Sequence, residues 1–337
     1  MIKNFNELTV VQGQNVPILG FITWLSTPQA FVPTDIYIEA YERLGLPKEE
    51  LLKPTSVADA YSLASSGLEI KRKKGKVEEN EETFRNVLVT EITNTPKLAI
   101  RKIVVQTIDP SVAGSDDDIE HSVEGIIRLD KEKNEITFEN LSNDPILEDL
   151  KKKFYADYQL YRTHFHSQKI RGPLTRLIKR MDPVRIKKTG GVYFVPYQYE
   201  EPLDRLGRFI DVLNKHAKSI DQEPFEFVQV EVARKQDMVE MVRRAYEYEM
   251  LKDIQEHQDE LRMLLEGTEK IDKKTVFKQF ERIKEMQKKA ATYRQLLSEK
   301  VMQLDTHFEI LKQQANALLE KVEDEADDDD GQLAVNL

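Results

Sequence analysis

A segment rich in basic side chains is the part of the sequence whose residue types most directly suggest chemistry. Between residues 162 and 188 there are nine cations and one acid, Asp182. Clustered lysine and arginine side chains bind phosphate groups, and aromatic rings beside them can stack on bases. The segment is therefore a candidate site for nucleic acid or another polyanion. Its cations are Arg162, Lys169, Arg171, Arg176, Lys179, Arg180, Arg185, Lys187 and Lys188.

The same segment has a plainer interpretation, in which the cations are solvated or matched to acids elsewhere in the fold. Helical spacing places Arg176, Lys179 and Arg180 on one helix face. This placement is compatible both with phosphate binding and with a solvated surface. The aromatic residues just upstream could stack on bases or pack against a sheet, and the sequence leaves both readings open. These aromatic residues are Tyr155, Tyr158, Tyr161 and Phe165.

The sequence contains no recognisable metal site or catalytic constellation. Cysteine is absent, which excludes disulfides, thiol nucleophiles and thiolate ligands. His164 and His166 are two residues apart in a stretch that we expect to be helical, where they would point to opposite sides. Asp116 begins a run that resembles a calcium loop, but Ile127 stands where the closing glutamate is needed. We therefore expect no metal, no cofactor and no enzymatic activity.

Two adjacent glycines precede a short apolar run that ends in proline. A dinucleotide fingerprint places its glycines between a strand and a helix, whereas these stand before the expected strand. Their expected role is structural: a tight turn or bulge with positive φ that leads into the strand, with partner contact as the alternative. The residues of this structural or contact element are Gly190, Gly191, Tyr193, Phe194 and Pro196.

The block TGGVYFVP at residues 189–196, preceded by RLIKRMDPVRIKK, resembles a segment found in uncharacterised proteins of phages and related mobile elements, whose function is unknown. The resemblance covers a short part of the chain and carries no catalytic residue. It implies a protein encoded by a virus or plasmid, acting in the host cytoplasm. An interaction with host machinery, including interference with defence, would follow from such an origin.

The elements that position these residues indicate an α+β fold. From Leu68 to Asn140 apolar and polar residues alternate in five segments, which predicts an antiparallel sheet with flanking helices. Residues 7–27 predict two more strands, and residues 146–168 and 173–181 predict helices. We expect a β-rich region over 1–142, and a region over 143–233 whose helices and GGVYFVP strand complete the body.

The chain from residue 234 to residue 322 predicts a long antiparallel coiled-coil hairpin. Apolar residues recur at steps of four and three, and we expect one continuous helix from Lys273 to Val322. Such an arm would extend past its partner helix, so its stripe would need a second copy or another protein to cover it. The residues of this seam are Leu297, Val301, Leu304, Phe308, Leu311, Ala315, Leu318 and Val322.

The net charge of −10 is concentrated at the end of the chain, because residues 323–330 hold seven carboxylates. We expect residues 323–337 to be a disordered acidic tail. No apolar run reaches the length of a membrane span, and we expect a soluble, cytoplasmic protein. Together these patterns favour a non-enzymatic protein that self-associates or binds a host protein through its coiled coil. A nucleic-acid-binding protein that uses residues 162–188 is the alternative.

Overall fold

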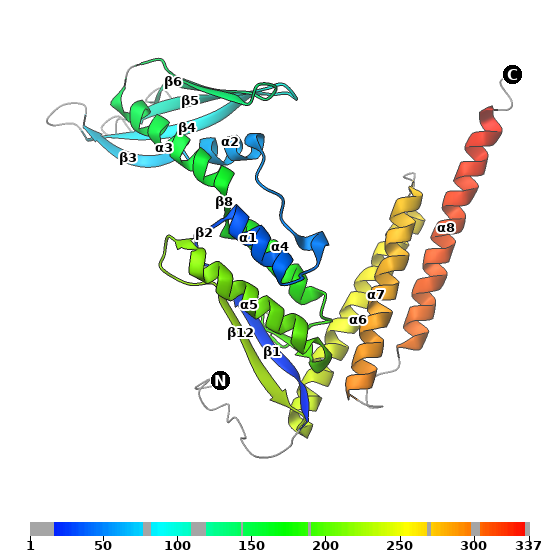
Figure 1. The fold of residues 1–337 in the computed structure, drawn as a ribbon. Helices are drawn as coiled ribbons and strands as arrows, with labels where there is room; N and C mark the ends of the chain where they lie inside the picture. Colours follow the sequence, from blue (N-terminus) through cyan, green and yellow to red (C-terminus); the bar gives the residue numbers. More distant parts are fainter. Residues whose placement is uncertain are drawn as a thin grey trace. The chain divides into compact units, whose positions relative to one another are not determined.

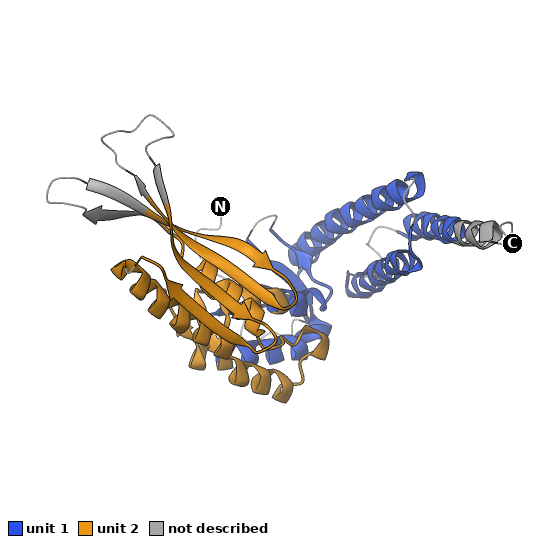
Figure 2. Ribbon diagram, turned by 90° about the horizontal axis from the view of Figure 1, so that it is seen from above, with its two compact units in different colours: residues 1–27, 174–211, 225–337 blue, residues 28–173, 212–224 orange. Residues whose placement is uncertain are grey.

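The computed structural model describes residues 17–76, 82–108, 119–142, 144–187, 190–267, 271–297 and 304–333. The chain divides into two compact units, coloured separately in Figure 2. Unit 1 comprises residues 1–27, 174–211 and 225–337, and unit 2 comprises residues 28–173 and 212–224. Each unit therefore combines segments that are far apart in the sequence. Two helices, α4 (Ser167–Lys179) and α5 (Glu200–His216), contribute residues to both units.

Unit 1 contains an antiparallel sheet of four strands in the order β12–β1–β10–β9. Figure 1 labels its first two strands, β12 and β1, which lie side by side. The predicted strand of the GGVYFVP block is present as β10, where Phe194 is opposite Ile22 of β1. Of the two strands predicted over 7–27, one corresponds to β1 and the other lies outside the described residues. The strands are β1 (Ile18–Ser26), β9 (Val184–Arg185), β10 (Tyr193–Pro196) and β12 (Glu226–Ala233).

Three long helices complete unit 1: α6 (Gln236–Glu266), α7 (Lys273–Leu297) and α8 (Asp305–Leu333). The rings of Tyr246 and Tyr293 stack at 4.6 Å, and Lys289 Nζ lies 2.7 Å from Glu249 Oε1, so α6 and α7 run antiparallel. Lys321 Nζ of α8 donates to the carbonyl oxygen of Leu265, at 3.0 Å, near the end of α6.

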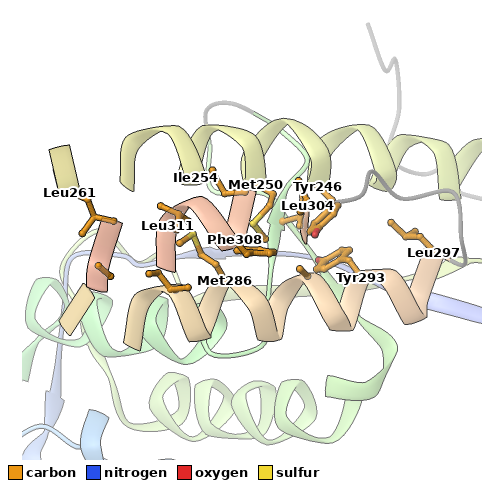
Figure 3. Close-up of a cluster of buried hydrophobic side chains, with 14 of the residues drawn as sticks. Tyr246, Met250, Ile254, Leu261, Met286, Tyr293, Leu297, Leu304, Phe308 and Leu311 are labelled. Carbon is orange, nitrogen blue, oxygen red and sulfur yellow. The ribbon is translucent and has the colours of Figure 1, made fainter. Parts of the chain in front are cut away.

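The continuous helix predicted from Lys273 to Val322 is wrong, because α7 ends at Leu297 and α8 begins at Asp305. The two-helix hairpin is replaced by a group of three helices that bury their apolar stripes against one another. Figure 3 shows their side chains meeting between the helices. The described seam residues are at most 6% exposed: Leu297, Leu304, Phe308, Leu311, Ala315, Leu318 and Val322.

This burial corrects the expectation that the seam needs an outside partner. Seam residues belong to one hydrophobic cluster with α6 and α7 residues of the same chain, including Met250, Ile254 and Met286. Val301 lies outside the described residues. The disordered tail expected over residues 323–337 differs from the structure, in which α8 continues to Leu333, and the last four residues lie outside the described ones.

Unit 2 contains the predicted antiparallel sheet, a meander of five strands in sequence order. Helices α2 (Val57–Ser66) and α3 (Pro145–Thr163) pack on one face of it, and Ser56 and Asp144 cap their first turns through their side chains. The prediction of a sheet with flanking helices is confirmed. The strands are β3 (Ile70–Lys76), β4 (Glu82–Asn94), β5 (Leu98–Ile108), β6 (Ile119–Asp130) and β7 (Glu135–Asn140).

A second, three-stranded sheet of unit 2 has the order β11–β2–β8. The helix predicted over 146–168 is wrong at its end, because α3 stops at Thr163 and the next three residues form β8. The helix predicted to start at residue 173 begins earlier, at Ser167. The elements of this part are β2 (Ala30–Pro33), α1 (Thr34–Arg43), β8 (His164–His166) and β11 (Lys218–Ser219), with short helices η2 (Lys48–Glu50) and, in unit 1, η5 (Tyr197–Tyr199).

His164 and His166 therefore lie on a strand, where side chains two residues apart share a side. His166 packs edge-on against Phe31, with ring centroids 5.0 Å apart, and burial lowers the pKa of both histidines. Within the described ranges, no group of three His, Cys, Asp or Glu side chains could hold a metal ion. No helix in that same part of the chain is both long and apolar enough to cross a membrane.

The two adjacent glycines have the positive φ expected of them, +93° at Gly190 and +64° at Gly191. Left-handed backbone is costly for a β-branched residue. Gly191→Val is therefore expected to lower the free energy of unfolding by about 1 kcal/mol or more, measured by chemical denaturation. Gly207→Ala is the control: a Cβ there would sit 3.5 Å from Phe227 in ordinary contact, and it should not destabilise the fold. Equal stability of Gly191→Val and the parent chain would contradict the assignment.

Candidate polyanion-binding surface

The second half of α4 presents cations on one side and apolar residues on the other. Leu174, Leu177 and Ile178 are at most 2% exposed and hold this part of the helix to the core. Spacing of three and four residues turns Arg176, Lys179 and Arg180 to the opposite side, where all three are exposed. The three cations expected on one helix face thus share a solvent-exposed face.

Asp182, which follows α4, has its carboxylate held inside unit 1. Tyr199 Oη donates to Asp182 Oδ2 at 2.5 Å, and Thr292 Oγ1 donates to the same oxygen at 3.1 Å. Tyr293 Oη donates to the carbonyl oxygen of Asp182 at 2.9 Å. Its φ of +47° is unusual for a residue other than glycine, and these three bonds stabilise that conformation. The acid of the basic segment is therefore half-buried, with one carboxylate oxygen bonded to η5 and α7.

The phenols that surround Asp182 stay protonated at neutral pH. Burial, followed by the hydrogen bond to Asp182, raises the pKa of Tyr199 to about 12. Burial also raises the pKa of Tyr293 well above its ordinary value. Both groups are consequently neutral donors to a carboxylate. Such an arrangement fixes the turn at Asp182 in place, and neither of the two phenols titrates near neutrality.

The hairpin between β9 and β10 carries the next two cations, Arg185 and Lys187, and both side chains are exposed. The backbone N–H of Arg185 donates to Glu249 Oε2 of α6 at 2.8 Å, while Lys289 Nζ of α7 lies 2.7 Å from the other oxygen of that carboxylate. The Arg185 guanidinium lies 6.0 Å from the ring centroid of Tyr193. The hairpin is thus fixed to two helices while its basic side chains face solvent.

Comparison with known proteins shows one relationship. Residues 18–325 match a family described as "Family of unknown function (DUF6744)". The chain belongs to this family. No curated protein and no solved structure matches it. The DUF6744 match includes the four-stranded sheet of unit 1 and the two sheets of unit 2, and it extends into α8, so it covers the basic segment together with the helices that fix it.

In this DUF6744 chain two of the nine predicted cations hold another segment in place. Arg162 Nη1 donates to the carbonyl oxygen of Thr55, and Lys169 Nζ lies 3.2 Å from Thr55 Oγ1 and 3.3 Å from the carbonyl oxygen of Lys53. Arg171 is exposed and belongs to unit 2, and Lys188 lies outside the described residues. Five of the nine therefore belong to unit 1: Arg176, Lys179, Arg180, Arg185 and Lys187.

The upstream aromatic residues of the DUF6744 chain pack inside the fold. Phe165 has no exposed area, and its ring meets Tyr37 at 5.0 Å. Tyr155, Tyr158 and Tyr161 are half-buried and pack against the core of the five-stranded sheet. Packing against a sheet, the second of the two interpretations, is the correct one for these tyrosines.

The residues that fix the basic hairpin were not identified from the sequence. Tyr199, Thr292 and Glu249 have no motif that sets them apart, and Thr292 is 110 positions from its partner Asp182. Asp182 before Pro183 was the one local signal, because this dipeptide favours a turn. In the strand that follows the two adjacent glycines, Phe194 and Pro196 are buried, and Tyr193 is half-buried beside Arg185.

Proposed function

We propose that this DUF6744 protein is a non-enzymatic binding protein that engages a polyanion, in the first place nucleic acid, through the basic surface of unit 1. The basic surface consists of Arg176, Lys179, Arg180, Arg185 and Lys187. One observation carries the proposal. All five side chains are exposed, and the one acid between residues 176 and 187, the half-buried Asp182, already accepts hydrogen bonds from Tyr199 and Thr292.

Such a surface suits contacts with phosphates in two respects. Lysine and arginine that neutralise phosphates release counterions, which supplies most of the affinity in sequence-independent binding. The chain that carries Arg185 is also fixed beforehand by the bond of its N–H to Glu249, so binding orders less backbone. A base-stacking role would fall to Tyr193, which is half-buried next to Arg185.

Self-association through a coiled coil was expected because the seam needed a partner to cover it. The described seam residues are already buried within the chain, so this argument no longer applies. A binding role in a host cell stays part of the proposal. It is supported by the resemblance of residues 189–196 to proteins of phages and mobile elements. On that basis we propose a cytoplasmic location, in the host if the protein is encoded by a virus.

Charge reversal tests the proposed binding. Arg176→Glu, Lys179→Glu, Arg180→Glu and Arg185→Glu together are expected to abolish salt-dependent binding to labelled single-stranded and duplex oligonucleotides, measured by fluorescence anisotropy. For the parent chain the logarithm of the affinity should fall linearly with the logarithm of salt concentration. Its slope should be about 0.9 per phosphate contacted on duplex DNA and about 0.7 on single strands.

A second quadruple variant separates the local surface from net charge. Lys274, Lys278, Lys284 and Lys288 of α7 are all exposed, and their replacement by glutamate changes the charge by the same amount. This control should weaken binding much less than the variant of the basic surface. Equal losses in the two variants would show that binding depends on overall charge, and no binding by the parent chain at low salt would refute the proposal.

A further inference from the structure

Strand β12 is an open edge of the four-stranded sheet in unit 1. The sheet order ends with it, and no other strand of the described chain pairs with its outer side. The strand has eight residues, EFVQVEVA. None of them is proline, a residue that would block pairing because it lacks a backbone N–H. The opposite edge, β9, has two residues, and its Arg185 N–H is already bonded to Glu249. Long open edges bind further strands.

Apolar side chains on β12 are incompletely covered. Val228, Val230 and Val232 alternate with polar residues and so lie on one face, where Val230 is opposite Ile22 of β1. Val232 is 4% exposed and belongs to the core, whereas Val228 and Val230 are half-buried. On the other face Phe227 packs near Gly207 of α5. An added strand would cover the two half-buried valines.

We infer that β12 pairs antiparallel with β12 of a second copy of the chain, about a two-fold axis at Val230. The sequence is self-complementary about that residue. Val228 would face Val232 of the second copy, Gln229 would face Glu231, and Glu226 would face Arg234. The pairing therefore forms a row of valines on one face, a polar pair on the other, and an opposite-charge pair at each end.

Charge also selects this arrangement over the alternatives. A parallel, in-register pairing would place Glu226 and Glu231 opposite themselves, and like charges directly opposite destabilise a sheet. One edge of the five-stranded sheet, β7, is less suitable for self-pairing. In β7 a two-fold axis at Thr137 would place Glu135 opposite Glu139. Of these two edges, β12 has the complementary charges, and a second copy is the partner that they fit.

Cysteine cross-linking gives a direct test, because the chain contains no cysteine. Directly opposite residues of an antiparallel pair have Cβ atoms about 4.5–5.5 Å apart, near the range of a disulfide. Val230→Cys is expected to form a disulfide-linked dimer under mild oxidation. Val123→Cys, at a valine on β6 that is 47% exposed, is the matched control and should stay monomeric. Equal cross-linking of the two variants would overturn the proposal.

A charge swap tests the orientation by sedimentation equilibrium. Glu226→Arg is expected to weaken the dimer by roughly tenfold, because the two-fold axis doubles the effect of each lost pair. Adding Arg234→Glu should restore the affinity. Since Arg234 Nη2 also donates to the carbonyl oxygen of Leu296, at 2.6 Å, the melting temperature of each variant is measured alongside. If Arg234→Glu is unstable, Glu226→Arg alone decides: unchanged affinity, or a parent chain that is monomeric at every concentration, would refute the pairing.

Discussion

Leu311→Ala is expected to lower the free energy of unfolding by about 2–5 kcal/mol. Leu311 has no exposed area and lies on α8 within the cluster shared with α6 and α7 (Figure 3). Truncation removes the transfer free energy of the lost methyl groups and leaves a cavity among rigid helices. Urea denaturation followed by circular dichroism measures the change. A loss below 1 kcal/mol would show that α8 is not packed as described.

Repeating the measurement at several protein concentrations distinguishes packing of α8 within one chain from packing between two chains. Because α8 packs on its own chain, the loss for Leu311→Ala should be the same at low and high protein concentration. A seam covered by a second copy would give a loss that changes with concentration. Ile310→Ala, at the neighbouring position and 40% exposed, is the matched control and should change stability by less than about 0.5 kcal/mol.

The break between α7 and α8 shows why the sequence predicted the stripe but not its partner. Apolar periodicity correctly marked the residues that are buried, including Phe308 and Leu318. It could not show where the helix turns back, because residues 298–303, SEKVMQ, contain neither glycine nor proline. One signal lay in Asp305, an acid in the first turn of α8 that also pairs with Arg294 of α7 at 3.0 Å.

The five-stranded sheet, in contrast, could be predicted from local sequence patterns. Its strands are joined in sequence order, so local alternation and turn signals define both the strands and their pairing. The four-stranded sheet joins β1 to β12, which are about two hundred residues apart, and no local pattern predicts such a pair. The same limit applied to the basic segment. Composition identified the cations, but only the fold shows that Arg162 and Lys169 hold the backbone near Thr55.

His257 of α6 is a buried polar residue that the sequence did not single out. It has no exposed area, and neither ring nitrogen has a hydrogen-bond partner. Glu260 Oε2 lies 3.9 Å from Nδ1. That carboxylate is already engaged by Gln279 at 3.0 Å and by Arg282 at 2.5 Å, both from α7. Burial, reinforced by the positive charge of Arg282, lowers the pKa of His257, while Glu260 and the backbone of Gln279 oppose the shift, although neither reaches a ring nitrogen in hydrogen-bonding geometry.

His257→Leu is expected to stabilise the protein, and to do so more strongly in mild acid. At neutral pH the substitution removes an unpaired buried N–H group, which costs about 1–3 kcal/mol. A lowered pKa means that the folded state binds fewer protons than the unfolded state, whose histidine pKa is about 6.5. Stability from the neutral imidazole is therefore present above about pH 6.5 and is lost as the pH falls, by up to about 1.4 kcal/mol per pH unit.

Urea unfolding from about pH 7.5 to about pH 5.5 separates the two contributions, because only the second depends on pH. The stability advantage of His257→Leu should widen as the pH falls, while the slope from His164 and His166, whose pKa values are also lowered, is common to both chains and cancels in the comparison. His216→Gln, at an exposed position of α5, is the control and should follow the parent chain. A constant advantage at every pH would mean that His257 is not protonated on unfolding. A loss of stability at neutral pH would mean that its nitrogens have partners, and that the polar contacts between α6 and α7 stabilise the helix group.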